Sequence, residues 1–280
     1  MTRLAEISED RATGTLAETY DDIRAVLGVP FVVLVYRAMA VVEGRLEAVW
    51  EAVRPNLLSE QTHQLAAALG TVSVPAVRGV DGAVIAASGL GLQLIADTLA
   101  AFHRANTRNA IVLWALHDGH DGAAPPLRPP APRTPIRRIL PMADLTSLSA
   151  SVSELLRMMS VPIAGAEPPM VIPSLLRCFA FDEPLLEELW MSLRPLLESD
   201  AYREHVADVR TRAQTSAAAL PYLVAPCRDA EARQIIARFL RTIPAMIAAA
   251  PMIAAALSPD LAAHPRNHPK GAQVPHERAC

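Results

Sequence analysis

The chain has 280 residues, is 51% hydrophobic but only 4% aromatic, and carries a net charge of −3 at pH 7. A chain of this length and apolar content can bury a large core, in one domain or in two. The charge excludes the basic surface that nucleic acid or an anionic membrane would need, so we expect neither partner.

The amino-terminal segment, residues 1–14, is polar and lacks the apolar stretch of a secretion signal. The most apolar stretch near the other end, residues 243–257, is shorter than a bilayer span and contains Pro244 and Pro251. The three cysteines include no closely spaced pair, which argues against a disulfide framework and a cysteine-based zinc site. We therefore predict a cytoplasmic protein with no membrane segment.

Helical periodicity dominates the first half of the chain. Apolar side chains recur at intervals of three and four residues at Leu46, Val49, Trp50 and Val53. Residues 90–116 have a similar pattern and predict one long helix or two shorter ones.

Part of that long segment, residues 100–116, carries polar side chains within an apolar helical pattern. They are His103, Arg104, Asn106, Arg108 and Asn109. His103 and Asn106 are three residues apart and so share one face of a helix. Because polar groups among buried neighbours must be hydrogen-bonded or functional, the segment is either a polar seam between helices or part of a binding site.

Two short motifs superficially match known sites. HDGHDG, at 117–122, has two histidines and two aspartates, but its glycines fit a solvated turn better than a metal site. GLGLQL, at 89–94, lacks the preceding strand and the acidic residue of a dinucleotide fingerprint. We expect neither a metal nor a cofactor.

The middle and the end of the chain are rich in proline. Residues 122–141 contain too many prolines for a helix or a strand, and we interpret them as a semi-extended crossover linker. Residues 258–280 are polar, with several prolines and three histidines, and predict a disordered tail. Such a tail cannot preorganise a metal site.

The second half returns to the helical period at Leu186, Leu189, Trp190 and Leu193. The positions expected for helix N-caps are occupied by Asp182, Ser199 and Asp229, and the last of these is expected to open a helix through Thr242. Since no segment shows sustained alternation of apolar and polar residues, we predict an all-α fold.

The two halves of the chain look like copies of one unit. When the sequence is shifted by 140 residues, residues 32–60 align with residues 172–200 without a gap. The identical pairs include Trp50 and Trp190, Arg54 and Arg194, Pro55 and Pro195, and Ser59 and Ser199. Shared composition does not explain these matches in a single register. We predict a first repeat at 1–121 and a second at 142–257, packed as a pseudo-dimer.

Several segments resemble the group I 2-haloacid dehalogenases, a non-stereospecific family. The matching residues are YDDIR at 20–24, LGVPF at 27–31, Arg37, Ala101-Phe102, Asn106 and Ala115-Leu116. The resemblance covers roughly residues 14–257 and implies an all-helical pseudo-dimer with its active site between the halves. It also implies a chemistry in which an aspartate activates water, which displaces halide from C2 of a short haloacid without an ester intermediate.

The resemblance assigns a largely apolar pocket. The family's asparagine, which positions water or substrate, falls on Asn106, and its two pocket aromatics fall on Phe31 and Leu34. We expect His103, from the polar segment described above, to line the substrate pocket too.

The family's catalytic aspartate falls on Ser174 or Leu175, depending on the alignment, and neither residue is a carboxylate. We retain Ser174 as a catalytic candidate beside Asn106, and Leu175 as a pocket residue. A serine hydroxyl with an ordinary pKa cannot act as the base that takes a proton from water at neutral pH, and the side chain of leucine cannot act as a base at all. The candidate for a substitute base is Glu167, which precedes this segment in a loop.

Three functions remain open. The leading hypothesis is a hydrolase-like enzyme of specialised metabolism that keeps the scaffold but hydrolyses, eliminates or cyclises a small to medium apolar carboxylic acid or derivative. The second is a true hydrolytic 2-haloacid dehalogenase with a substitute base. The third is a non-catalytic protein that binds a ligand in the pocket. All three take a small-molecule partner, and a homodimer is compatible with each.

Overall fold

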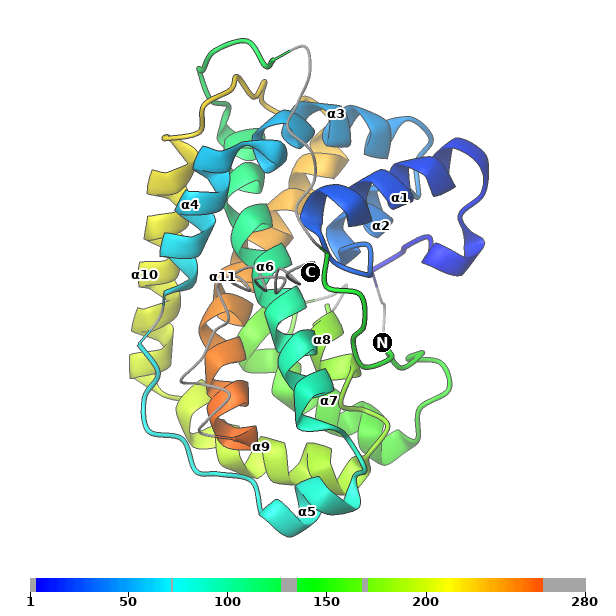
Figure 1. Ribbon diagram of the computed structural model, residues 1–280, viewed down its shortest axis with the longest axis vertical. Helices are drawn as coiled ribbons and strands as arrows, with labels where there is room; N and C mark the ends of the chain where they lie inside the picture. The colour runs from blue at the N-terminus through cyan, green and yellow to red at the C-terminus, as the bar shows by residue number, and fades with distance from the viewer. Residues whose placement is uncertain (1–3, 72, 127–134, 168–170, 259–280) are drawn as a thin grey trace, which may run out of the picture.

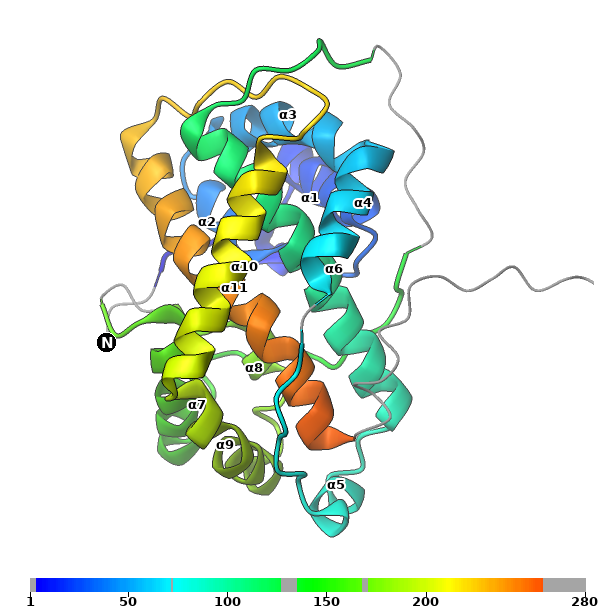
Figure 2. The ribbon, with the colours of Figure 1, turned by 90° about the vertical axis from the view of Figure 1, so that its left-hand side faces the viewer.

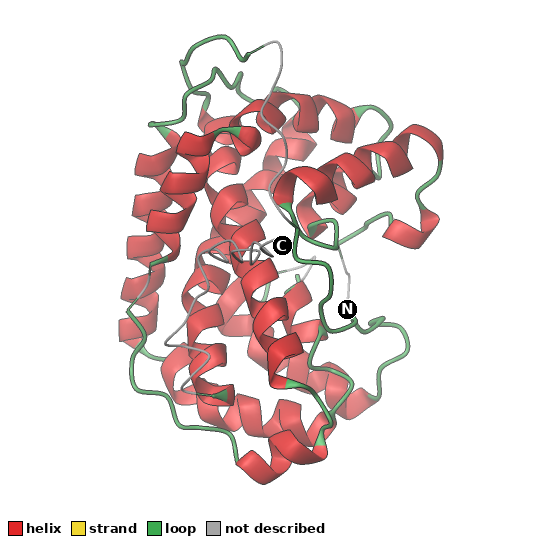
Figure 3. Cartoon of the chain, viewed as in Figure 1, coloured by secondary structure: helices red, strands yellow, loops and turns green. Residues whose placement is uncertain are grey.

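In a computed structural model, which describes residues 4–71, 73–126, 135–167 and 171–258, the chain is built from α-helices (Figures 1 and 3). The described residues contain no strand, only the isolated bridges of His120 with Val224 and Ala123 with Tyr222. The prediction of an all-α fold is confirmed.

The first half starts with a short 3-10 turn, η1 (Glu9–Arg11). Its helices are α1 (Gly14–Leu27), α2 (Leu34–Met39), α3 (Arg45–Leu58), α4 (Glu60–Gly70), α5 (Gly82–Ala87) and α6 (Leu92–Asp118). The helices of the second half are α7 (Ala150–Ala164), α8 (Ser174–Arg177), α9 (Glu183–Leu197), α10 (Asp200–Ala217) and α11 (Ala230–Leu257).

The two longest helices, α6 and α11, pack antiparallel at the centre of the molecule (Figures 1 and 2). Most residues of both helices are buried, so they are the centre of the core. At one end of the pair, Nη1 of Arg233 donates to the carbonyl oxygen of His117 at 3.0 Å. Helices α1–α3 lie at one end of this pair, and α7–α9 lie at the other (Figure 1).

Helix starts follow the predicted N-caps. The side chain of Asp182 accepts a hydrogen bond from the amide of Leu185 at 2.8 Å, and that of Ser199 accepts one from the amide of Tyr202 at 3.1 Å. The carboxylate of Asp229 accepts two amide hydrogen bonds at the start of α11. These side chains satisfy donors that have no partner within the helix, which fixes where each helix begins.

The end of α11 differs from the prediction. The helix does not stop at Thr242 but continues through Pro244 and Pro251 to Leu257. Each proline removes one backbone donor and disfavours a helix by about 3 kcal/mol. Burial of the apolar side chains from Ile243 onward on several sides outweighs that cost.

By length and composition, α11 could also span a membrane, because its most apolar window has a mean hydropathy of 1.6. However, 83% of that window is buried inside the protein. Such burial is typical of the central helix of a globular core.

The YDDIR segment, one of those that carry the family resemblance, holds α1 in place. The carboxylate of Asp22 accepts hydrogen bonds from Nε1 of Trp50 at 2.7 Å and from Nε of Arg54 at 2.6 Å. Burial alone would raise the pKa of Asp22, but the hydrogen bonds from Arg54 and Trp50 outweigh it and lower the pKa. The hydroxyl of Tyr20 donates to the carbonyl oxygen of Ile7 at 2.9 Å. These contacts fasten α1 to α3 and to the amino-terminal segment.

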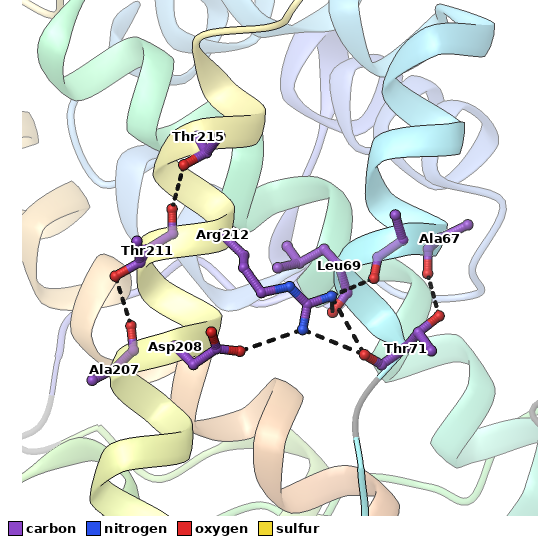
Figure 4. Close-up of polar contacts among 9 residues, drawn as sticks. Ala67, Leu69, Thr71, Ala207, Asp208, Thr211, Arg212 and Thr215 are labelled. Carbon is purple, nitrogen blue, oxygen red and sulfur yellow. Dashed lines mark hydrogen bonds and ion pairs between the residues drawn. The ribbon is translucent and has the colours of Figure 1, made fainter.

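A contact between α4 and α10 joins the first half of the chain to the second. The guanidinium of Arg212 on α10 lies against the carboxyl-terminal end of α4 and donates to the carbonyl oxygen of Ala68 at 2.5 Å (Figure 4). Longer contacts reach the carbonyl oxygens of Leu69 and Thr71. Arginine is well suited to this position because it satisfies unpaired carbonyls and balances the negative end of the helix dipole.

The predicted loops lie mostly at the surface. Helix α6 includes His117 and Asp118 of the HDGHDG motif and ends at Gly119, which has a φ of 83°. Nε2 of His120 lies 2.7 Å from the carbonyl oxygen of Leu220. The described parts of the crossover linker contain no helix, and the amide of Ile136 donates to Gly28. Apart from Ser258, the predicted tail lies outside the described residues.

Candidate functional site

A cavity of about 40 Å³ lies where α2, α6, α8 and α11 meet. Its lining comes from both halves of the chain and is mostly apolar. The lining residues are Phe31, Val33, Leu34, Phe102, Asn106, Val171, Pro173, Ser174, Leu175, Phe239, Thr242, Ile243 and Met246. Five of the six residues predicted to form the pocket are therefore brought together: Phe31, Leu34, Asn106, Ser174 and Leu175.

Two short helices, α2 and α8, supply part of the lining. Each follows an extended residue, Val33 before α2 with φ −63° and ψ 140°, and Pro173 before α8 with φ −56° and ψ 129°. The first residue of each helix, Leu34 or Ser174, lines the cavity. A proline is compatible with this geometry because its fixed φ suits an extended N-cap and it needs no hydrogen-bond acceptor.

An aromatic pair forms part of the wall. The rings of Phe31 and Phe102 stack with their centroids 4.3 Å apart and their planes inclined by 23°. Both side chains are buried, so the pair joins the segment before α2 to α6.

Two polar groups of the lining are free to bind a ligand. The Asn106 side chain is 8% exposed and makes no hydrogen bond with any other residue that the structure describes. The hydroxyl of Ser174 is buried and likewise has no partner among the described residues. The hydroxyl of Thr242, by contrast, bonds to the carbonyl oxygen of Arg238 at 3.2 Å. Buried polar groups without protein partners are expected to bind water or a ligand.

The other polar residues near Asn106 in residues 100–116 form a polar seam between helices, which is one of the two arrangements that the sequence left open. Asn109 accepts a hydrogen bond from the Tyr36 hydroxyl at 2.5 Å. Arg104 and Arg108 donate to the carbonyl oxygens of Gly28 and Leu27, both at 2.9 Å. Burial, with a further contribution from Arg104, lowers the pKa of Arg108 to about 10. These three residues hold α6 to its neighbours, whereas Asn106 does not.

His103 is not among the cavity residues, contrary to its predicted place in the pocket. It hydrogen-bonds to the backbone of Gly70 at the end of α4. A Cβ atom at Gly70 would lie 2.4 Å from Nε2 of His103, so this close approach depends on glycine. Residues three apart on a helix differ by about 60° in direction, which is enough to point His103 at α4 and Asn106 at the cavity.

Glu167, the candidate for a substitute base, lies away from the cavity. Its side chain is 82% exposed, and Oε2 is 3.7 Å from Nη2 of Arg241. None of the described residues that line the cavity is a carboxylate. The described part of the chain also contains no group of three histidine, cysteine or acidic side chains arranged to hold a metal ion.

Comparison with known proteins identifies the fold. No family model matches the sequence. An (R)-2-haloacid dehalogenase from Pseudomonas putida is 24% identical over 247 residues, which cover 80% of this chain and 78% of that protein. A D-2-haloacid dehalogenase mutant in complex with D-2-CPA has a similar structure, with a TM-score of 0.72 and 19% identity over 90% of this chain and 94% of that one. The fold is that of a D-2-haloacid dehalogenase.

A second structure of a D-2-haloacid dehalogenase, with L-LA, has a TM-score of 0.70 at the same identity and coverage. At 19% identity the scaffold of the D-2-haloacid dehalogenases is retained while most side chains differ, so the chemistry of the site must be argued from its own residues.

Sequence reasoning missed the contribution of α11 to the site. Phe239, Thr242, Ile243 and Met246 line the cavity, but none belongs to a recognisable motif. The 140-residue shift could have found two of them, because it relates Thr242 to Phe102 and Met246 to Asn106.

Proposed function

We propose that this protein is a diverged enzyme on the 2-haloacid dehalogenase scaffold that acts on a small apolar carboxylic acid or its derivative. One observation carries the proposal: among the described residues that line the cavity between the halves, Asn106 and Ser174 have side chains without a hydrogen-bond partner, and none is a carboxylate. A mostly apolar chamber with a few polar groups is typical of a small-ligand site. The loss of the aspartate defines the divergence from the group I family.

The proposal includes an internal duplication, with the cavity near a pseudo-two-fold axis. Helices α2 and α4 begin 140 residues before α8 and α10. Ten of the thirteen lining residues form pairs at the same spacing: Phe31 with Val171, Val33 with Pro173, Leu34 with Ser174, Phe102 with Thr242, and Asn106 with Met246. Superposition of one half on the other should bring Trp50 onto Trp190, and unrelated environments for these two residues would refute the duplication.

The size of the cavity favours a small ligand. One water needs roughly 10–15 Å³ of such space, so 40 Å³ accommodates only a few water-sized groups. The stacked pair of Phe31 and Phe102 supplies an apolar wall for a short carbon chain. We therefore favour the small end of the range of acids considered.

The chemistry follows from the two polar groups. The amide of Asn106 can donate to and accept from a ligand, so it can orient a carbonyl group or a water molecule. The Ser174 hydroxyl can donate one hydrogen bond, but it has no adjacent histidine or carboxylate among the lining residues to activate it. These groups suit polarisation of a carbonyl in an elimination or cyclisation better than activation of water for displacement of halide.

The two alternatives rank lower for specific reasons. Dehalogenation with a substitute base requires Glu167 to leave Arg241 and enter the cavity, although its side chain is 82% exposed. A non-catalytic binding protein fits the lack of a base equally well, and it differs from the enzyme only in turnover.

Replacement of Asn106 tests the proposed site. We expect short acids such as 2-chloropropionate and propionate to raise the melting temperature of the unaltered protein, and we expect Asn106→Leu to abolish that rise. Its own melting temperature should barely change, because no described residue loses a partner. Asn109→Leu is the matched control: it leaves the buried Tyr36 hydroxyl unpaired, at a cost of about 1–3 kcal/mol. This control should melt several degrees lower and keep its response to acids.

The opposite pattern would contradict the assignment. If Asn106→Leu lowers the melting temperature as much as Asn109→Leu and the response to acids persists, Asn106 is a core residue and the ligand binds elsewhere.

A further inference from the structure

A buried arginine and a partly buried one meet outside the cavity, 140 residues apart in the chain. Arg37 on α2 and Arg177 at the end of α8 are 140 residues apart, and each lies three residues after a cavity residue, Leu34 or Ser174. Their side chains are only 5% and 11% exposed. A carboxylate from the amino-terminal segment, that of Glu6, lies between them.

The backbone around the pair is arranged in the same way on both sides. The amide of Ile7 donates to the carbonyl oxygen of Arg37 at 3.1 Å, and the amide of Ala143 donates to that of Arg177 at 3.2 Å. The Tyr20 hydroxyl also holds the amino-terminal segment in place, because it donates to the carbonyl oxygen of Ile7. Glu6 is therefore fixed next to α2 by its neighbours rather than placed freely.

The two guanidinium groups share the carboxylate of Glu6, since Nε of Arg37 lies 2.9 Å from Oε2 of Glu6 and Nη1 of Arg177 lies 3.8 Å from Oε1. Asp144 contributes a further negative charge near Arg177, with a weaker effect than that of Glu6. The next acidic residue of the segment, Glu9, bonds instead to Arg24 and to the amide of Val32. Burial, which is the largest cause, and the charge of Arg37 lower the pKa of Arg177, and the negative charges of Glu6 and Asp144 only partly oppose them.

The bound carboxylate also has imperfect geometry. Although Arg37 Nε and Glu6 Oε2 are at ion-pair distance, they are not aligned as a hydrogen bond, and Nη2 of Arg37 has no hydrogen-bond partner among the described residues. The guanidinium fork is well matched to a carboxylate that approaches with both oxygens. Glu6 is attached to the chain and does not reach that arrangement.

We propose that Arg37 and Arg177 form a carboxylate-binding site that Glu6 occupies from within the same chain. The tethered carboxylate holds α2 to α8, and a free carboxylate takes its place when Glu6 is absent. The site is distinct from the cavity and does not depend on the function proposed for it.

Chemical rescue tests this proposal. Glu6→Ala should melt several degrees below the unaltered protein, because Arg37 and Arg177 lose the carboxylate that they share. Sodium acetate should then raise its melting temperature in a saturable way, beyond the effect of sodium chloride at the same ionic strength. Glu6→Gln serves as the matched control, since its amide fills the position without the charge: it should also melt lower but should not respond specifically to acetate.

The acetate experiments can either support or overturn the proposed carboxylate-binding site. An acetate effect on Glu6→Ala no larger than that of chloride, or equal acetate effects on Glu6→Ala, Glu6→Gln and the unaltered protein, would overturn the proposal. If Glu6→Ala is unfolded without acetate, recovery of its helical circular dichroism in acetate supports the site. Failure to recover, while Glu6→Gln folds, overturns it. The double variant Glu6→Ala/Arg177→Leu should lose the rescue.

Discussion

Asn106 and Asn109 lie one turn apart on α6, yet they serve different purposes. Asn109 is fully buried and bonded to the Tyr36 hydroxyl, whose pKa is raised by burial. Asn106 lines the cavity and has no partner in the described part of the chain. The spacing of the polar residues along the sequence indicated a shared helix face. It could not show that Asn109 meets Tyr36 while Asn106 faces the cavity, because the residues around each asparagine come from distant parts of the chain.

The environment of His103 predicts a pH dependence of stability. Burial lowers the pKa of His103 below its usual 6.5, and the hydrogen bond to Gly70 only partly opposes this effect. The folded state thus favours the neutral imidazole, while the unfolded chain takes up a proton near pH 6.5. As the pH falls below that value the unfolded state binds more protons, so the free energy of unfolding should decrease.

The measurement is urea unfolding at about pH 7.5 and about pH 5.5, on either side of the ordinary histidine pKa. His103→Gln cannot titrate, so this variant should lose less stability than the unaltered protein over that interval. An equal loss in both proteins would show that His103 does not contribute.

At the scale of elements, the contact of α10 with α4 predicts the effect of a single side chain. Arg212→Leu removes the donor to the last carbonyls of α4 and should lower the free energy of unfolding by roughly 1 kcal/mol. Arg157→Leu is a suitable control, since Arg157 is exposed and, among the described residues, pairs only with Glu154 in its own helix. Chemical denaturation of both variants measures the difference, and equal effects would mean that the cap contributes nothing.

The helices were predictable to the extent that their signals are local. The caps at Asp182, Ser199 and Asp229 fixed three starts, because each side chain satisfies the first amides of its own helix. The end of α11 was not predictable, since the packing that carries the helix past Pro244 and Pro251 involves other elements. The very short helices α2 and α8 were not predicted from the sequence either, although their residues line the cavity.

For the whole molecule, the internal comparison of the sequence was more informative than any motif. Matches between residues 32–60 and 172–200 pointed to two related halves, and the cavity has lining residues from both. Five predicted pocket residues line it, whereas His103 does not, because its direction depends on where α4 packs. Of the α11 residues, Thr242 and Met246 correspond to the α6 lining residues Phe102 and Asn106 under the same shift, whereas Phe239 and Ile243 correspond to no lining residue.

In the function that we propose, the protein retains the dehalogenase scaffold but lacks the base. Leu175 is buried and lines the cavity at one of the two positions where the resemblance expects the aspartate. Leu175→Asp should restore a carboxylate there, and Leu175→Asn is the matched control, because an amide of the same shape cannot accept the proton of water.

The most direct test is halide release from both enantiomers of 2-chloropropionate at neutral pH, followed with an ion-selective electrode. We expect no turnover by the unaltered protein or by Leu175→Asn, and measurable turnover by Leu175→Asp. Steady halide release by the unaltered protein would contradict it, and loss of that release in Glu167→Gln would then assign the base to Glu167.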